Sequence, residues 1–490
     1  MHLLQQHNFD IQCSSPEIGK EVQGQLSALL EKEFYPKLEI LLNQYSYKNH
    51  TWNIDLVELQ LPKISRKNWK SELIQKSLQQ MENYLREYSP GISTQYNDDI
   101  IAANSFVPNK EYATFLFFTF LKTGILQENT IGKDLDKIIN EIEITAVFLK
   151  QLIAIFEEEP KHIIRWIFSV PDSFKKKIME SITGFPLAFR VFLEEILLSE
   201  KEASVEIKQF WKRFHGNKEL ALQWIELIQW FSHLYRIGNT KERVLKEFEK
   251  FSKEFWEISA VELTMFSKSI AVVLKTEKTL ENYEMELFFQ TFSQSITSNR
   301  KDNLPDTVDL ETEFPKSEGA VLDEALYINN AGLIILHPFL KTLFEQLELC
   351  ENDNWKNKMS QHKAILLTQY LITGKKKIQE NDLVLNKILC GLSIEEVINT
   401  KLKITAEEKE KCRSLLKAVL EYWKTMSSSS VEALQETFLQ REGKLETERE
   451  NTYELWVEEK GYDILLAQLP WGIGMVKTPW MENYLTCHWN

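Results

Sequence analysis

Residues 327–344 read YINNAGLIILHPFLKTLF and form what we call the LHPFL segment. The run stays mostly apolar up to Leu349 and contains one proline, Pro338. Downstream, apolar residues return at helical spacing in four stretches, 364–371, 383–392, 415–423 and 431–440. A hydrophobic period near 3.6 residues marks a helix with one buried face. Residues 325–490 are therefore predicted to form a C-terminal helical domain.

From Tyr453 onward the hydrophobic period changes. Tyr453, Leu455 and Val457 alternate with polar residues, and residues 472–478 are short, apolar and interrupted by glycine. A period of two is typical of a strand. We expect two or three short strands to close the C-terminal domain.

The same tail is rich in tryptophan, with Trp456, Trp471, Trp480 and Trp489. Two interpretations stay open. Either these rings pack in the core of the small sheet, or they form an aromatic docking surface for another protein, because tryptophan often dominates the binding energy of interfaces.

Residues 301–324 precede the LHPFL segment and carry eight acidic residues, two basic residues and two prolines. Like charge and proline keep a chain extended and solvated, so this stretch is predicted to be a linker. Before it, residues 111–300 have helical spacing almost throughout. Pro160, Pro171 and Pro186 are expected to divide the first half of that region into short helices.

No proline occurs between Pro186 and Pro305. Within this stretch five apolar residues are spaced four, three, four and three apart, as in a heptad seam. They are Val244, Phe248, Phe251, Phe255 and Ile258. This pattern fits a helical bundle packed within one chain, and it also fits a coiled coil between several chains.

Residues 1–90 have the pattern of a small mixed module. His7–Cys13 and Trp52–Leu61 alternate as strands do. The pair Ser15–Pro16 predicts a helix start, with serine as the cap and proline in the first turn. A second helical pattern starts at Trp69, and residues 91–110 read as a polar loop. The expected order is strand, helix, strand, helix.

The predicted fold class is therefore mainly α with small β elements. It combines the N-terminal strand-helix-strand-helix module (1–90), a central helical bundle or rod (111–300), an acidic linker (301–324) and a C-terminal helical domain closed by a few short strands (325–490). The chain has 490 residues, 43% of them hydrophobic and 27% charged, which is the balance of a globular protein.

Charge and cysteine content narrow the classes of partner and compartment. The formal net charge is −14, which disfavours binding to nucleic acid and to anionic membranes. The five cysteines lie far apart and form no C-x-x-C pair, as is usual in a reducing cytoplasm. The first residues lack the pattern of a secretion signal. The most apolar stretch, 113–121, is half of the ~18 residues that a membrane span requires.

Sequence patterns for catalysis are missing. No P-loop, dinucleotide-binding, zinc-protease or nucleophile-elbow motif occurs, so no catalytic residue, cofactor or metal ligand is predicted. His337 lacks a nearby acid or cysteine at ligand spacing, and we expect it to be a structural histidine that hydrogen-bonds the backbone. Glu157–Glu159 point in three directions on a helix and are predicted to be a solvated helix end.

The LHPFL segment resembles the "NAGL-x-x-LHPFL-x-x-LF" signature of contractile injection system tape measure proteins. Segments 366–374 and 385–392 are similar to the family as well, and so are 9–11 and 54–61 near the N-terminus. The recognised similarity covers about 1–90 and 325–490 and leaves the middle unmatched. The matching site residues are Asn330, Ala331, Gly332, Leu333, Leu336, His337, Pro338, Phe339, Leu340, Leu343, Phe344, Pro470, Trp471, Pro479 and Trp480.

This resemblance implies a structural protein that assembles a phage-tail-like particle. Such a protein lies in the lumen of the growing inner tube and sets its length, or it initiates the tube at the baseplate side. The implied partners are tube, spike or baseplate proteins and further copies of the chain. The implied location is the cytoplasm during assembly, with later release inside an extracellular particle as a further alternative. The motif residues carry no catalytic role and are structural or docking positions.

The length of the middle region weighs against a simple rod. The proline-free stretch 187–304 would span about 180 Å as one helix. Either the tube is short, or folded ends dock while only part of the middle extends, or the chain is stored compact and unfolds as the tube grows. Two other functions stay open: a helical scaffold or adaptor unrelated to injection particles, and an enzyme of unfamiliar helical fold built around His337.

Overall fold

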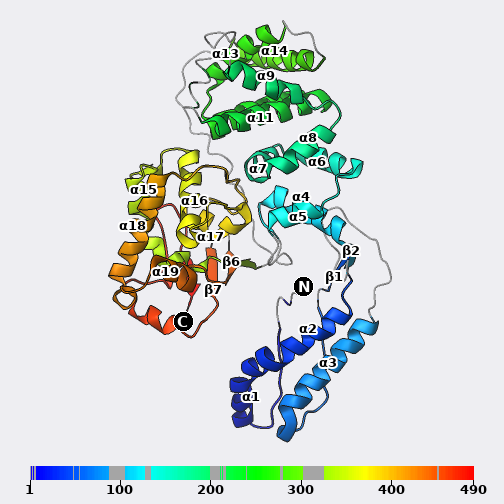
Figure 1. The fold of residues 1–490 in the computed structure, drawn as a ribbon, viewed down its shortest axis with the longest axis vertical. Helices are drawn as coiled ribbons and strands as arrows, with labels where there is room; N and C mark the ends of the chain where they lie inside the picture. Colours follow the sequence, from blue (N-terminus) through cyan, green and yellow to red (C-terminus); the bar gives the residue numbers. More distant parts are fainter. Residues whose placement is uncertain are drawn as a thin grey trace. The chain divides into compact units, whose positions relative to one another are not determined.

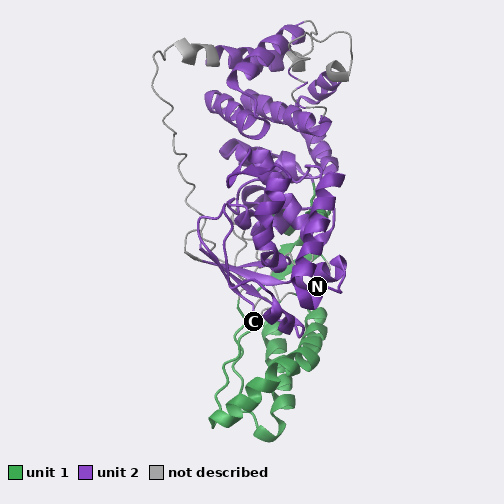
Figure 2. Ribbon diagram, turned by 90° about the vertical axis from the view of Figure 1, so that its left-hand side faces the viewer, with its two compact units in different colours: residues 1–117, 128–143 green, residues 118–127, 144–490 purple. Residues whose placement is uncertain are grey.

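The computed structural model is mainly helical with small β elements, as the sequence predicts (Figure 1). It describes residues 2, 4, 7–47, 49–54, 56–87, 105–126, 134–198, 210, 212, 214, 217–238, 240–275, 280–301, 325–449 and 452–489. The acidic linker therefore lies outside the described residues, apart from Lys301. The chain divides into two compact units, residues 1–117 with 128–143, and residues 118–127 with 144–490 (Figure 2).

The first unit is built around paired helices. Helix α1 (Pro16–Leu29) continues through a π-helical turn (Leu30–Phe34) into α2 (Tyr35–Gln44), and α3 is Trp69–Glu87. The side chain of Ser15 accepts a hydrogen bond from the backbone N–H of Ile18, so the predicted helix start is confirmed. The unit's small apolar core comprises Leu29, Leu30, Phe34, Leu38, Leu73 and Ile74.

The strands of this unit differ from the prediction. Strand β1 is His50–Asn53, and it pairs antiparallel with β2 (Ser105–Pro108), which lies in the segment expected to be a loop. The expected strand at His7–Cys13 is wrong, because those residues belong to no strand. Phe9 and Leu61 instead pack against the helical core. Their alternation reflects extended chain lying on helices and not a hydrogen-bonded ladder.

The unit also contains the start of α4 (Asn109–Thr123) and all of α5 (Leu135–Glu141). Helices α6 to α9 of the second unit follow the prolines of the sequence: α6 is Ala146–Glu158, α7 Lys161–Ser169, α8 Asp172–Ser181 and α9 Leu187–Leu198. Pro160 and Pro171 are the residues immediately before α7 and α8. The predicted helix boundaries are confirmed because proline lacks the N–H that an inner turn needs.

The proline-free stretch is several helices and not one rod. Helix α11 is Lys218–Ile237, α12 Lys241–Trp256, α13 Ala260–Leu274 and α14 Leu280–Lys301. Helix α11 ends at Gly238, and α12 ends at Glu257, which has a left-handed φ of 54°. Ser259 and Glu262 then form a reciprocal capping box that starts α13. Capping residues thus stop these helices where proline is absent.

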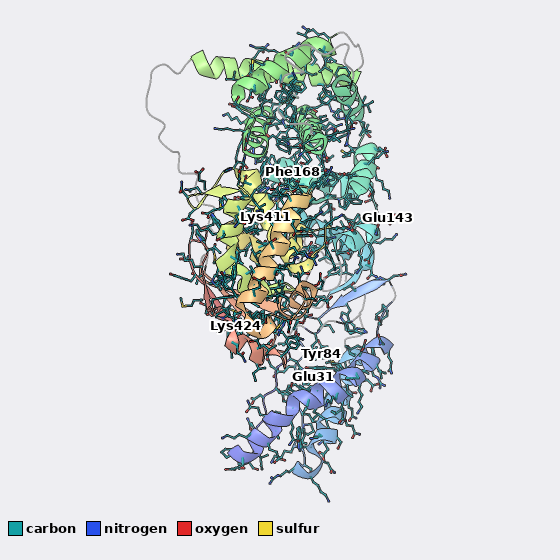
Figure 3. All side chains as sticks on the ribbon, turned by 60° about the vertical axis from the view of Figure 1, so that its left-hand side comes forward. Glu31, Tyr84, Glu143, Phe168, Lys411 and Lys424 are labelled. Atoms are coloured by element: carbon teal, nitrogen blue, oxygen red, sulfur yellow. The ribbon has the colours of Figure 1, made fainter. Side chains whose placement is uncertain are left out.

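The heptad-like seam is buried within the chain. Phe248 is fully buried, and its ring lies 5.7 Å from that of Phe231 on α11 and 5.4 Å from that of Phe288 on α14. Phe168 on α7 packs at 5.5 Å from the ring of Phe255 and lies among the dense side chains of the central helices (Figure 3). The interpretation as an intrachain bundle is therefore confirmed over a coiled coil between chains.

The C-terminal part of the second unit packs helices on one face of a five-stranded sheet. The helices are α15 (His337–Gln346), α16 (Lys358–Thr373), α17 (Val384–Leu389), α18 (Ala406–Tyr422) and α19 (Val431–Leu434). The strands are β3 (Leu326–Ile328), β6 (Gly443–Arg449), β7 (Thr452–Val457), β8 (Met475–Val476) and β9 (Leu485–His488), in the order β3-β6-β7-β9-β8. A separate two-stranded ribbon is formed by β4 (Cys350–Glu351) and β5 (Asn354–Trp355).

This sheet exceeds the expected two or three tail strands. Strand β9 runs parallel to β7, and β6 and β9 were not predicted. Leu445, Leu455 and Leu485 face the helices and are fully buried. Only Leu445 among the seven residues of β6 is a large apolar residue, so that strand has almost no period-two signal.

Candidate functional site

The LHPFL segment forms three consecutive elements in the centre of the C-terminal core. Strand β3 leads into a 3₁₀ helix, η4 (Ala331–Leu336), which runs directly into α15. All six residues of η4 are buried. Of the predicted site residues that follow, Leu340, Leu343 and Phe344 are buried as well. The segment is thus an internal part of the fold.

Asn330 fixes the entrance to this 3₁₀ helix. Its side-chain Nδ2 lies 3.0 Å from Gln369 Oε1, 2.9 Å from the Asp382 carbonyl oxygen and 2.8 Å from Asn386 Oδ1. Asn386 in turn donates to the hydroxyl of Thr368 at 2.8 Å. A buried amide needs such partners because an unpaired polar group in a core costs about 1–3 kcal/mol. The network therefore specifies how β3, α16 and α17 meet.

Gly332 permits a close backbone approach between the 3₁₀ helix η4 and residues 438–439. A Cβ atom at this position would lie 1.8 Å from the carbonyl oxygen of Phe438 and 2.7 Å from the Cα of Leu439. Next to it, the N–H of Ala331 donates to the carbonyl of Arg441 at 3.0 Å. Glycine is required here because the facing atoms are backbone and cannot move aside.

The two tail tryptophans of the motif pack on the LHPFL segment from 130 or more residues away in sequence. The indole N–H of Trp471 donates to the carbonyl of Ile335 at 2.9 Å, and its ring meets Phe339 edge-on at 5.0 Å. Trp480 stacks on Trp355 at 4.3 Å and lies 5.5 Å from Phe344. The structure therefore brings both halves of the motif into one cluster.

A second glycine seats the Trp480 segment. Gly391 has a φ of +69°, and a Cβ there would lie 2.2 Å from the carbonyl oxygen of Trp480. The hydroxyl of Thr478 donates to the carbonyl of Leu389 at 2.6 Å. Pro470 and Pro479, each just before its tryptophan, are exposed. Trp489 is buried and Trp456 is 45% exposed, so these rings divide between core and surface.

His337 has the structural contact that the sequence predicts. Its Nδ1 lies 2.8 Å from the carbonyl oxygen of Ile334, one turn earlier. Burial lowers the pKa of His337 below its usual range, so the ring is neutral at pH 7. Pro338 is exposed in the first turn of α15, where its missing N–H has no helical partner to lose.

One buried ion pair at the motif was missed by sequence reasoning. Asp463 binds Arg441 with two hydrogen bonds of 2.6 and 2.8 Å, and it also accepts from the indole N–H of Trp489 at 3.0 Å. Burial alone would raise the pKa of Asp463, but the hydrogen bonds from Arg441, Lys460 and Trp489 lower it. The pair joins the segment just before β6 to the turn after β7, and the bond from Trp489 adds the segment after β9.

A second charged cluster joins the central helices to this domain. Glu380 accepts from Arg165 at 3.2 Å, from Lys387 at 3.0 Å and from Ser169 at 2.7 Å. Arg165 also donates to the carbonyls of Leu121 and Lys122 at the end of α4, at 2.7 Å each. The sequence signal for this charged cluster was a lone arginine, Arg165, in the apolar run 163–168. A charge so placed needs a buried partner.

Neither a metal-binding cluster nor a membrane-spanning helix is found in the described part of the chain. Among the described residues, no cluster of three histidine, cysteine or acidic side chains could hold a metal ion. No helix within those residues is both long and apolar enough to cross a membrane. Glu157 and Glu158 are exposed at the end of α6, as predicted for a solvated helix end.

The comparison with protein families decides the identity. The family model for contractile injection system tape measure proteins matches residues 1–489. The chain belongs to this family. No curated protein and no solved structure matches it. The resemblance read from the LHPFL segment is confirmed, but the tape measure match extends through the middle region, where the sequence alone showed none. Membership assigns a structural role in assembling an injection particle and overturns the unrelated scaffold.

Proposed function

We propose that this tape measure chain sets the length of the particle's inner tube. In this proposal residues 111–300 are the scale, residues 325–490 are a docking head, 301–324 is the linker and 1–90 is a separate module. The proposal is supported by the family match across the central helices. The family model matches this middle region as well as the two ends of the chain. The compact packing of the LHPFL segment supports a folded head.

The proposed partners are tube, spike or baseplate proteins and further copies of the chain in the lumen. Assembly is proposed to occur in the cytoplasm, with no catalysis and no cofactor. His337 is proposed to be a structural residue, because its Nδ1 hydrogen-bonds the carbonyl of Ile334 at the start of α15. The site residues are proposed to act by holding the head together, and not by direct docking, because most of them are buried.

One observation favours the rival role of a tube initiator. The 190 residues of 111–300 would span about 285 Å as one helix, yet Gly238 and Glu257 interrupt the helices of this region. A chain that stays folded in this way would dock and nucleate without measuring. The two roles differ in whether tube length follows the length of the middle region.

The deciding experiment measures particle length after a helical insertion. Three heptads, 21 residues, are inserted between Gly238 and Thr240, where the break between α11 and α12 tolerates added chain. A ruler predicts tubes longer by about 30 Å, at ~1.5 Å per residue. Length distributions are measured by electron microscopy of purified particles.

The matched control places the same 21-residue insertion between Ser427 and Ser428, in an exposed turn of the head. The head contributes no scale, so tube length should not change. Unchanged tubes with the Gly238 insertion would refute the ruler. Loss of particles only on deletion of the gene would then identify the chain as an initiator.

A further inference from the structure

Polar side chains, which we call the polar joint, link the central helices to the C-terminal domain, beside a ring contact of 6.1 Å between Phe255 and His362. Its members on α7, α8, α11 and α12 are Arg165, Ser169, Asp172, Glu219, Gln223 and Glu254. Its members on the C-terminal side are Lys358, Glu380, Lys387, Asn399, Lys401 and Lys403.

The middle of the polar joint is fully buried. The side chains of Arg165 and Glu380 have no exposed surface, and that of Lys387 has 1%. Beside them, Gln223 and Asn399 form a reciprocal amide pair with hydrogen bonds of 3.3 and 2.9 Å. Two cations and one carboxylate thus lie where a permanent interface would place apolar side chains.

The rim of the polar joint consists of three ion pairs. Asp172 lies 2.5 Å from Lys401, Glu219 lies 3.2 Å from Lys403, and Glu254 lies 3.3 Å from Lys358. Each pair links a central helix to the C-terminal domain. They give three independent chemical reporters of whether the two sides are in contact.

The chemistry of the joint contrasts with that on either side of it. Aromatic rings such as Trp224, Trp230 and Phe248 fill the central helices, and the C-terminal core is aliphatic and aromatic. Permanent interfaces resemble such cores, whereas polar contacts between parts of one chain permit them to separate. Water solvates the charges and amides of the joint well once they part.

The chain's connectivity leaves room for separation. The two sides are joined through the 23 residues 302–324, which can span at most about 75 Å at ~3.3 Å per residue. Opening therefore requires no unfolding of either side. The apolar core of each side stays intact while the polar joint becomes hydrated.

We infer that the polar joint is a release contact. It is closed in the unassembled chain and opens when the chain enters the tube, so that the central helices extend away from the head. This inference rests on the proposed ruler function, since only a measuring chain needs to extend.

Zero-length cross-linking tests the release on the unmodified protein. A water-soluble carbodiimide joins a carboxylate and a lysine amine that are already in contact, forming an amide with loss of water. The purified free chain and the chain in purified particles are treated alike, and linked peptides are quantified by mass spectrometry. The reporters are the three rim pairs. The controls are Lys341–Asp353 at 2.6 Å within the head and Lys246–Glu242 at 3.1 Å within α12.

The expected result is a loss of at least tenfold in all three rim cross-links in particles, relative to the controls. Rim cross-links that persist in particles at the free-chain level would overturn the release contact, while the ruler could still stand on the insertion experiment. Rim cross-links already absent in the free chain would overturn it too. Absence of the chain from particles would refute the proposed function and the release contact with it.

Discussion

The Asp463→Asn substitution gives a direct measure of what the buried ion pair contributes to the head. Asparagine has nearly the shape of aspartate and keeps an oxygen that can accept from Arg441. The guanidinium of Arg441 is 2% exposed, and Asp463 is the carboxylate paired with it. The substitution therefore leaves a buried cation without its counter-charge.

The expected loss follows from this geometry. Removing one partner of a buried ion pair destabilises a protein by about 3–5 kcal/mol, because the remaining charge stays desolvated. Two cation–π contacts reduce the expected loss of stability, because the guanidinium lies over the rings of Tyr462 and Trp489 at 5.3 and 5.1 Å. Cation–π contacts contribute about 0.5–2 kcal/mol. We expect a loss of about 3 kcal/mol at pH 7.

The pH dependence provides a second signature. Because the pKa of Asp463 is lowered on folding, the folded state binds fewer protons than the unfolded state near the ordinary aspartate pKa of about 3.9. The stabilisation is present above that pH and is lost as the pH falls through the lowered value. The difference between wild type and Asp463→Asn should be constant from pH 6 to 8 and should shrink below about pH 4.

The assay is equilibrium urea unfolding followed by tryptophan fluorescence at several pH values, since Trp423 and Trp489 are buried in the head. Asp353→Asn is the matched control. Its partner Lys341 is 42% exposed, so that change should cost less than about 1 kcal/mol. A loss below 1 kcal/mol for Asp463→Asn at pH 7, or a loss that does not shrink in acid, would contradict the reasoning.

Further substitutions test the remaining contacts. Gly332→Ala should abolish soluble, cooperatively folding protein because its Cβ collides with backbone, whereas Gly461→Ala, with nothing within 4 Å, should behave as wild type in thermal unfolding. His337→Ala should lower the free energy of unfolding by about 1 kcal/mol through the lost backbone hydrogen bond and leave particle yield intact; lost particles from a folded variant would revive a chemical role. Trp471→Phe should cost about 1–3 kcal/mol in urea unfolding by leaving the carbonyl of residue 335 unpaired, and no change would show that water replaces the indole. Glu380→Gln should increase the radius of gyration in X-ray scattering without loss of helical circular dichroism, and an unchanged radius would argue against a separable joint.

The helices were the most predictable part of the fold, because their signals are local. Pro160 and Pro171 end one helix and precede the next through the missing N–H, and Ser15 caps the first helix with its own side chain. The sequence also identified the buried LHPFL segment and the tail tryptophans. It left open whether the tryptophans pack inward, which for Trp471 depends on a backbone carbonyl 136 residues away.

The strands and charged clusters were less predictable, because their causes are not local. Strand β6 pairs with β3 across more than 100 residues and shows one large apolar side chain to the core. The alternation at His7–Cys13 predicted a strand, yet these residues belong to no strand and Phe9 packs on the helical core. Arg165 and Glu380 are 215 residues apart. The local sequence around either residue does not predict the other as its partner.

The strand order of the head has a consequence for how the protein is made. Strand β9 lies between β7 and β8, and β3 can pair only after β6 has been synthesised. The sheet cannot close until residue 488 has left the ribosome, whereas the central helices make local contacts and fold during synthesis. A chain that stops before β9 would still form its central helices but could not complete the sheet of the head. Without β9, strand β8 would lose its neighbour and the sheet would lack its link to β7 on that side.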